Sequence, residues 1–361
     1  MAGFGPIATS THARAEFSLT PAVRLPGVRA LTWYGDQLYA ARGYELLRAR
    51  IEDASCPKWE SLSAFHPALT RRLTASNRVT ARLFRDGFHS AAVLPSGGIV
   101  AAVAGAIVSL PPQEKEFRVT HTITRGTRPL HITAIPSGSV FWGEYFDNAA
   151  RGEVHIYASR DGENWEVAYA FPERSIRHVH NIVFDRWENC LWILTGDYGD
   201  ECRILRAEFD LSRLDTVLQG NQQARAVALV PMPDGLYFAS DTPLEHNFIY
   251  RLDRDRKLSR LAPISSSSIC GCRVGERIFF STMVEPSRVN TDPHVRIYGA
   301  NCGSQKWQSL LEWKKDFLPM SLFQYGNAFF PNGDNATPYL AVTTNAVQRD
   351  DLVTSIYRIQ P

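Results

Sequence analysis

Three arginines recur at nearly constant spacing in the middle of the chain. Arg128, Arg177 and Arg225 lie 49 and 48 residues apart, and each begins a short apolar run. A guanidinium group binds a planar carboxylate or a phosphate through two parallel hydrogen bonds. If the repeats are arranged around an axis, their equivalent positions meet at one end of the molecule. The spacing therefore predicts a site for an anionic ligand.

Other polar residues occupy two equivalent positions in these repeats: the segment that enters the first strand and the segment that follows the second. Beside the arginines, the first position holds His89, His131, His178 and His180. The second position holds Glu144, Tyr145, Asn148, Asp197, Tyr198, Asp200, Glu201, Asp241, Glu245, His246, Glu285 and Arg288. Because loops on a rigid scaffold often carry function, we expect these residues to share one rim.

Imidazole titrates near neutral pH, so it can accept or donate a proton with little tuning. His131 and His180 each follow a rim arginine by three residues. We predict that the catalytic residues are His180, His131, Tyr145, Glu144, Asp197 and Asp241. We predict that the ligand is held by Arg128, Arg177, Arg225, His178, His89 and His246.

Each of these residues also has a structural interpretation. The arginines can join one repeat to the next through a carboxylate such as Asp197 or Asp241, and ion pairs of this kind contribute only about 0–1 kcal/mol at a surface. The histidines can hydrogen-bond neighbouring strands. Glu144 and Tyr145 can latch two repeats together.

A divalent cation is a third interpretation of the same residues. His178 and His180 with Asp197 or Asp200 offer nitrogen and oxygen ligands, and the loop with Asp197, Asp200 and Glu201 offers oxygens for calcium. We predict no cofactor and assign no metal-binding residue, with a divalent cation as the alternative.

The chain is dominated by short runs of Val, Ile, Tyr, Phe and Trp, broken by Gly, Pro, Asn or Asp. Such runs are typical of β-strands, and a repeat of about 50 residues is typical of the four-stranded blades of a β-propeller. We therefore expect an all-β protein, a single propeller with seven blades. The first unit begins near residue 29, and the others span about 89–123, 128–171, 177–218, 225–261, 269–313 and 320–359.

The last unit offers only three good strands before the sequence stops. An unclosed ring would leave an unpaired edge, so we expect residues 15–20 to supply its fourth strand, with Phe17 and Leu19 in the same sheet as residues near Tyr357. Residues 1–14 are then an N-terminal extension, and residues 15–361 form one propeller domain. The clearest helical segment, residues 64–75, is expected to join two blades.

The composition argues against several partners. Lys and Arg number 39 against 37 Asp and Glu, a net charge of +2 without a basic stripe, so we expect no nucleic acid. We find no signal peptide and no apolar run near the roughly 18 residues of a membrane span, so we expect a soluble, cytoplasmic protein with no membrane partner. Six cysteines are too few for a disulfide framework. Cys270 and Cys272 are expected as buried thiols, with redox or metal chemistry as the alternative.

One motif carries a family resemblance. The segment Ser159-Arg-Asp161-Gly162-Glu-Asn-Trp165 matches the Asp-box pattern, and Gly303-Ser-Gln-Lys-Trp307 is a weaker echo that lacks the Asp. The chain therefore resembles the BNR or Asp-box repeat proteins, the β-propeller superfamily that includes sialidases. The resemblance implies a hairpin between outer strands in which Asp161 and Ser159 tie the turn and Trp165 packs into the blade, on the face opposite the catalytic centre. Seven-bladed polysaccharide lyases and glycosidases are similar as well.

We therefore expect a carbohydrate-active enzyme, a glycoside hydrolase or a uronate lyase, that acts on an acidic sugar or oligosaccharide. In a lyase, Arg177 or Arg225 neutralises the uronate carboxylate while His180 or Tyr145 moves the neighbouring proton. In a hydrolase, two carboxylates such as Glu144 and either Asp197 or Asp241 face each other across the pocket. The alternative is a non-catalytic propeller that binds a glycan or a protein on its rim.

Overall fold

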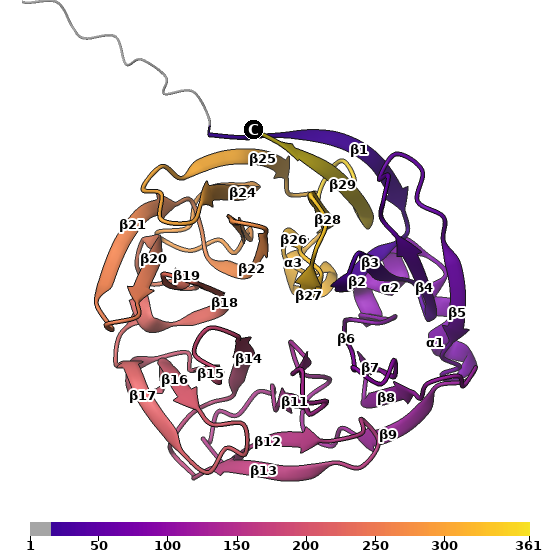
Figure 1. Cartoon of the computed structure of the whole chain (residues 1–361), viewed down its shortest axis with the longest axis horizontal. Helices are drawn as coiled ribbons and strands as arrows, with labels where there is room; N and C mark the ends of the chain where they lie inside the picture. Colours follow the sequence, from indigo (N-terminus) through magenta and orange to yellow (C-terminus); the bar gives the residue numbers. More distant parts are fainter. Residues whose placement is uncertain (1–15) are drawn as a thin grey trace, which may run out of the picture.

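The computed structural model describes residues 16–361, and these form a closed ring of seven antiparallel sheets around a central axis (Figure 1). The predicted all-β propeller with seven blades is confirmed. The predicted N-terminal extension, residues 1–14, lies outside the described residues. We number the blades 1 to 7 from the first complete sheet.

The first three blades follow the chain from inside to outside. Blade 1 consists of β2 (Arg29–Gly35), β3 (Gln37–Arg42), β4 (Glu45–Arg50) and β5 (Glu60–Ala64). Blade 2 consists of β6 (Ser90–Val93), β7 (Ile99–Val103), β8 (Ala106–Leu110) and β9 (Arg118–Thr122). Blade 3 consists of β10 (Thr133–Ala134), β11 (Val140–Gly143), β12 (Val154–Ser159) and β13 (Glu166–Phe171).

The next three blades repeat this order. Blade 4 consists of β14 (Val179–Asp185), β15 (Cys190–Thr195), β16 (Arg203–Ala207) and β17 (Leu214–Gln219). Blade 5 consists of β18 (Ala226–Met232), β19 (Gly235–Ser240), β20 (Asn247–Asp253) and β21 (Leu258–Ile264). Blade 6 consists of β22 (Ser268–Val274), β23 (Arg277–Thr282), β24 (His294–Asn301) and β25 (Gln308–Lys314). Short 3₁₀ turns lie at Gly199–Glu201 and Gln222–Ala224.

Blade 7 joins the two ends of the described chain. It consists of β26 (Asn327–Phe329), β28 (Tyr339–Asn345), β29 (Val353–Gln360) and β1 (Ser18–Pro26). The register pairs Leu19 with Ile359 and Pro21 with Tyr357, and Figure 1 shows β1 alongside β29. Closure by the N-terminal strand is therefore confirmed. Phe17 precedes β1, and its buried ring packs edge-on against Phe279 of blade 6 at 5.7 Å between centroids.

Three features differ from the prediction or go beyond it. A short strand, β27 (Asn332–Asn335), pairs in parallel with β2 and adds a fifth strand at the inner edge of blade 1. The predicted helical segment between blades 1 and 2 is a pair of helices, α1 (Leu69–Ala75) and α2 (Arg78–Phe84). Asn77 begins α2 by accepting a hydrogen bond from the amide of Val79, as an N-cap does. A third helix, α3 (Met320–Phe323), precedes blade 7.

The hydrophobic core lies mainly between adjacent blades. The sheets bury Trp192 and Leu194 of blade 4 against Leu236 and Phe238 of blade 5. Burying an apolar side chain of this size contributes roughly 1.5–3 kcal/mol, and each interface repeats the contribution around the ring. The core therefore holds the inner strands at fixed positions around the axis. No helix of residues 16–361 has the length and apolar character needed to cross a membrane.

The hairpin between β12 and β13 has the contacts that the Asp-box resemblance implies. The Ser159 hydroxyl donates to Asp161 Oδ1 at 2.9 Å, and the same oxygen accepts the amides of Glu163 and Asn164 at 2.8 Å. Trp165 donates from Nε1 to Thr120 in blade 2 and packs edge-on against Trp142. The motif thus stabilises the outer part of blade 3.

Candidate functional site

A cavity of about 350 Å³ lies where the inner strands meet, and we call it the central cavity. Its wall is built from the ends of inner strands and the loops beside them, in all seven blades. Seven of the predicted site residues line it: His89, Arg128, His131, Tyr145, His180, Arg225 and Asp241. The repeat positions therefore bring side chains that are far apart in sequence to one cavity.

One side of the central cavity is a cluster of arginines that we call the arginine cluster: Arg29, Arg85 and Arg128. Burial, then the charges of Arg29 and Arg85, lower the pKa of Arg128 to about 9. Burial lowers the pKa of Arg29 to about 10. Within residues 16–361, none of the three pairs with a carboxylate, and like charges this close repel one another. The cluster is therefore suited to an anion.

Two histidines border the same cluster. Burial, and then the charge of Arg128, hold the pKa of His89 well below its usual range. Burial lowers the pKa of His131 to about 4. Both imidazoles are therefore neutral at physiological pH. His89 donates its one proton from Nε2 to the carbonyl of Arg85 at 2.7 Å, so its Nδ1 can accept a hydrogen bond without adding charge.

The opposite side of the cavity carries carboxyl groups, chiefly Asp241 and Glu285. Burial raises the pKa of Asp241 to about 7, and Arg225 only partly opposes it. Burial also raises the pKa of Glu285. Asp241 Oδ1, Glu285 Oε2 and Asn327 Oδ1 are buried without a hydrogen-bond partner. Such atoms cost about 1–3 kcal/mol each, so hydroxyl groups of a ligand would find acceptors here.

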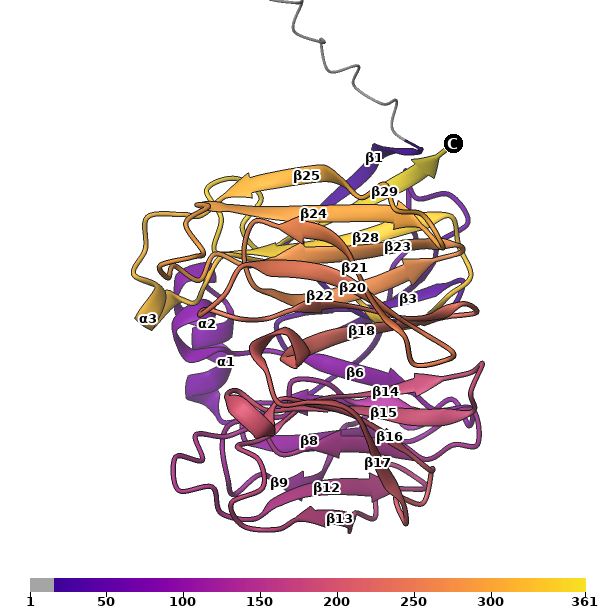
Figure 2. The same ribbon diagram turned by 90° about the vertical axis from the view of Figure 1, so that its left-hand side faces the viewer.

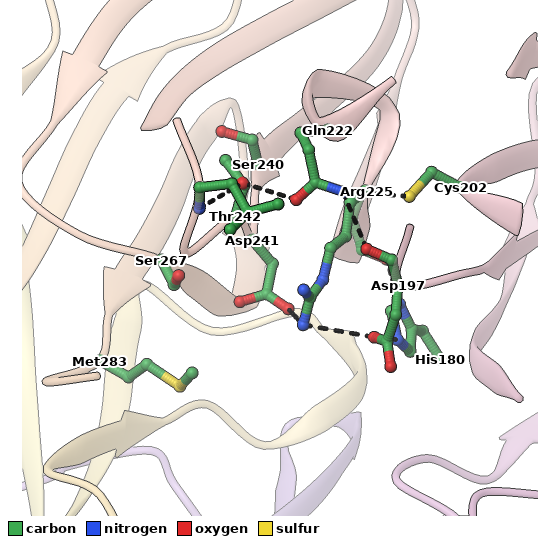
Figure 3. A network of polar contacts seen from close by, with 12 residues as sticks. His180, Asp197, Cys202, Gln222, Arg225, Ser240, Asp241, Thr242, Ser267 and Met283 are labelled. Atoms are coloured by element: carbon green, nitrogen blue, oxygen red, sulfur yellow. Dashed lines mark hydrogen bonds and ion pairs between the residues drawn. The ribbon is translucent and has the colours of Figure 1, made fainter. Parts of the chain in front are cut away.

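Arg225 lies between two carboxylates from neighbouring blades (Figure 3). Its Nη2 is 3.3 Å from Asp197 Oδ1 of blade 4 and 3.4 Å from Asp241 Oδ2 of blade 5. Arg177 makes the equivalent pairs with Asp197, at 3.1 Å, and with Asp147 of blade 3, at 2.5 Å. Two of the three periodic arginines therefore join adjacent blades, as the structural interpretation held. Only Arg128 of the three is without a carboxylate partner in the described residues.

His178 and His180 form a buried pair beside Asp197. Their Nδ1 atoms lie 3.2 and 3.0 Å from the carbonyl oxygens of Phe146 and Ala226. A carbonyl only accepts, so each Nδ1 carries a proton and donates it. The two Nε2 atoms then lie 3.1 Å apart, each 3.5 Å from Asp197 Oδ1. Burial lowers the pKa of His180, and the facing lone pairs leave room for one shared proton.

Asp197 and Tyr145 both contact the pair of His178 and His180. Burial alone would raise the pKa of Asp197, but the proton that His178 and His180 can share beside its Oδ1 and the charge of Arg225 outweigh it and hold that pKa below its usual range. The Tyr145 ring packs against His178 at 4.3 Å between centroids and lines the cavity. Burial raises the pKa of Tyr145 to about 12, so its hydroxyl stays protonated.

The same three ligand atoms of His178, His180 and Asp197 lie within 4.8 Å of one another, the spacing that a divalent cation requires. The carboxylate of this group already faces Arg177 and Arg225. These two positive charges oppose a cation at the same oxygen atoms. The geometry thus permits the metal alternative while the electrostatics favour a proton.

The remaining predicted residues lie away from the cavity wall. Arg177, His178 and Asp197 stand directly behind it, through the contacts above. Glu144 is buried in a different environment: its carboxylate accepts from Arg125 Nε at 2.9 Å and from the amide of His155 at 2.8 Å. Arg125 and the backbone amide of His155 in β12 therefore hold Glu144 away from the cavity. The next residue, Tyr145, points toward the cavity instead.

His246 is likewise not brought to the cavity. It lies exposed in the loop between β19 and β20, where its carbonyl oxygen accepts from Gln223. The loop residues that follow the second strand spread over the rim, and only some residues near the start of each loop, such as Tyr145, Asp241 and Glu285, line the cavity. Asp241 begins its loop and reaches the cavity, whereas His246 comes five residues later.

Sequence reasoning missed several lining residues, notably Arg29, Arg85, Asn327 and Asn332. Arg29 begins the first strand of blade 1, so the repeat that identified Arg128 contained a signal for it. Arg85 has no such signal, since it lies beyond α2 in an insertion. Its backbone is left-handed, with φ of 54°, and ends the helix.

A second, larger cavity of about 810 Å³ lies beneath α1 and α2. It shares Arg29, Arg85, His89 and Gln324 with the central cavity. Its floor includes aromatic residues, among them Tyr44 and Phe88. The two cavities therefore adjoin at the arginine cluster, and together they offer more room than a single sugar ring requires.

No family model matches the chain, and no curated protein matches it. Solved structures do. An oligogalacturonate lyase from Vibrio parahaemolyticus is 9% identical with a TM-score of 0.61, and the match covers 95% of this chain and 91% of that one. The WD40 β-propeller domain of Doa1 is 12% identical, with a TM-score of 0.57 and coverage of 94% and 96%. An ancestral GH74 enzyme is 10% identical, with a TM-score of 0.55 and coverage of 92% and 46%. At these identities the likeness shows the propeller fold alone.

Proposed function

We propose that this protein is a carbohydrate-active enzyme that acts on an acidic sugar or oligosaccharide in the central cavity. The observation that carries the proposal is the arginine cluster, which has no carboxylate partner within residues 16–361 and lines the same cavity as Asp241 and Glu285. A ligand with a carboxylate at one end and hydroxyl groups at the other matches both sides. Uronic and sialic acids have this chemistry.

The arginine cluster binds the carboxylate of the sugar. Each hydrogen bond to a charged group contributes about 1.5–3 kcal/mol, and neutralising the cluster also relieves the repulsion among Arg29, Arg85 and Arg128. His89 and His131 are neutral at this site, so they orient the ligand by hydrogen bonds. This assignment replaces Arg177 and Arg225, whose charges Asp147, Asp197 and Asp241 already balance.

Proton transfer belongs to the groups around His180. The space for one proton between His178 Nε2 and His180 Nε2 makes this pair a base. Asp241, with a pKa of about 7, and the neutral Tyr145 can protonate a leaving oxygen. In a uronate lyase the arginine cluster stabilises the negative charge that develops when the pair removes the proton beside the carboxylate.

A glycoside hydrolase uses the same cavity differently. Asp241 would protonate the glycosidic oxygen, and Glu285 would activate water or attack the sugar. Both residues line the cavity and both have a raised pKa. The Asp-box hairpin in blade 3 supports a place among BNR-type propellers, which include hydrolases. We retain both reaction types within the proposal.

A panel of oligosaccharides tests the proposal. Uronate-containing, sialylated and neutral oligosaccharides are incubated with the protein, and both ultraviolet absorbance of an unsaturated product and new reducing ends are followed. We expect turnover of an acidic substrate, and Arg128→Gln should reduce it. Absorbance identifies a lyase, and reducing ends without absorbance identify a hydrolase. Binding without turnover would instead support a non-catalytic glycan-binding propeller. The absence of both binding and turnover would refute the proposal.

A further inference from the structure

Exposed apolar side chains gather on one part of the molecule. Eight of the fifteen large exposed hydrophobic residues in the described chain lie in two short segments. They are Leu69, Leu73, Val79, Leu83 and Phe84 on α1 and α2, and Phe317, Leu322 and Tyr325 around α3. Phe317 is 90% exposed, and Leu69 and Leu73 are 68% and 64% exposed. We call these eight residues the helical face. Monomeric proteins rarely expose so many apolar residues together without a partner.

The helical face is one connected surface. Arg82 of α2 is buried, and its Nε donates to the carbonyl of Phe323 at 3.2 Å while its Nη1 lies 2.5 Å from Asp316. Gln324 donates back to the carbonyl of Arg82 at 2.7 Å. Figure 2 shows α1, α2 and α3 together on one flat side of the disc. The polar contacts beneath hold the backbones in place, so the apolar side chains point outward.

The charge around these side chains is positive. Residues 67–85 contain five arginines and no Asp or Glu. Arg71 pairs with Asp86 and Arg82 with Asp316 and Asp351. Arg78 Nε lies 3.6 Å from Asp351, although the Arg78 side chain is 63% exposed. Arg72 is exposed and has no carboxylate partner within residues 16–361. The helical face is therefore apolar with a basic surround.

We propose that the helical face docks on the surface of an anionic lipid bilayer. Apolar side chains project from separate points, the two helices and the loop at Phe317, and a bilayer accepts such projections without a matching shape. The exposed Arg72 side chain on α1 pairs with a lipid phosphate. Amphipathic segments with this combination of apolar and basic residues lie in the membrane interface without crossing it. The overall composition is nearly neutral and does not indicate a membrane contact, because the basic residues are concentrated in one short segment.

Docking in this way sets the orientation of the central cavity. Arg85 follows α2 and lines that cavity, as do Met320, Gln324 and Tyr325 around α3. The mouth of the cavity therefore borders the helical face. A protein bound by this face takes up its ligand beside the lipid headgroups. The proposal concerns the surface alone and does not depend on the reaction in the cavity.

The test is flotation of the full chain with lipid vesicles. Vesicles of phosphatidylcholine with about 30% phosphatidylglycerol are compared with vesicles of phosphatidylcholine alone. We expect binding to the anionic vesicles that weakens as salt rises above about 0.1 M, because the Debye length shortens. Arg72→Gln should lower the partition coefficient about five-fold, because one arginine near an anionic surface contributes about 1 kcal/mol to binding.

A triple variant, Leu69→Ser, Leu73→Ser and Phe317→Ser, should lower the partition coefficient by tenfold or more. The matched control changes Val119→Ser and Val167→Ser, two exposed apolar residues on outer strands of blades 2 and 3. Since all these residues are exposed, unchanged thermal unfolding should verify that each variant folds. The absence of binding to anionic vesicles, or equal binding by the triple variant and the parent, would overturn the proposal. Self-association that the triple variant abolishes, without vesicle binding, would assign the helical face to a second copy instead.

Discussion

Arg29 and Arg128 meet in the central cavity as like charges from blades 1 and 3. Burial, and then the charge of Arg29, lower the pKa of Arg128 to about 9. Arg177 and Arg225 occupy the same repeat position as Arg128, yet each is paired with two carboxylates. These arginines therefore differ in their ion-pair partners.

Replacing Arg128 with Gln should reduce the affinity for an acidic sugar by about 10- to 100-fold, because at least one charged hydrogen bond is lost. The melting temperature should stay unchanged or rise, since a repulsion is removed. Arg177→Gln is the matched variant: it should destabilise the protein and leave affinity near that of the parent. Calorimetric titration and thermal unfolding measure both. Equal loss of affinity in the two variants would contradict the assignment.

The free energy of unfolding should depend on pH through the titration of Asp241. Its pKa is about 7 in the folded state and 3.8 in its ordinary state. A raised pKa means that the folded state holds the proton more tightly, so the stabilisation is complete at low pH and lost as pH rises through about 7. Relative to the parent, Asp241→Asn should gain about 2–4 kcal/mol in free energy of unfolding between about pH 4 and pH 8.

Denaturant unfolding at several pH values measures this difference. Asp255→Asn is the control, because Asp255 is exposed in the turn between β20 and β21. A parallel, pH-independent offset between parent and Asp241→Asn would show that Asp241 does not titrate in this range.

His180→Ala should lower the turnover rate by about 10²- to 10⁴-fold, the usual effect of losing a general acid or base. Affinity for the acidic sugar should survive, because the arginine cluster is unaffected. His246→Ala is the control, since His246 is exposed on the rim. Single-turnover kinetics and equilibrium binding separate the two effects. Full turnover by His180→Ala would remove this residue from the mechanism.

Phe17→Ala should destabilise the ring by about 3–5 kcal/mol, because a buried ring between blades 6 and 7 leaves a cavity. Val167→Ala, at an exposed position of β13, should change stability by less than about 0.5 kcal/mol. Chemical denaturation measures both. If Phe17→Ala were as stable as Val167→Ala, the N-terminal segment would not hold the ring closed.

Much of the site follows from the repeat. His89, Arg128, His131, Tyr145, His180, Arg225 and Asp241 were expected on one rim, and all line the central cavity. Glu144 and His246 were expected there too, and the structure places them elsewhere. The spacing of residues along a strand indicates which end of the strand a residue occupies. It does not indicate whether the side chain of that residue points toward the central axis.

The sequence by itself determined the number of blades and the strand that closes the ring, because hydrophobic alternation and turn residues act locally and repeat with the chain. Only the tertiary structure decided which arginine is left without a carboxylate partner among residues 16–361. Arg225 is neutralised by Asp197, a residue of the preceding blade, and Arg128 is joined by Arg29 and Arg85 from blade 1 and from the insertion that follows it. Ion pairs between blades form across the packed interface, so their presence or absence depends on side chains that the repeat pattern does not relate.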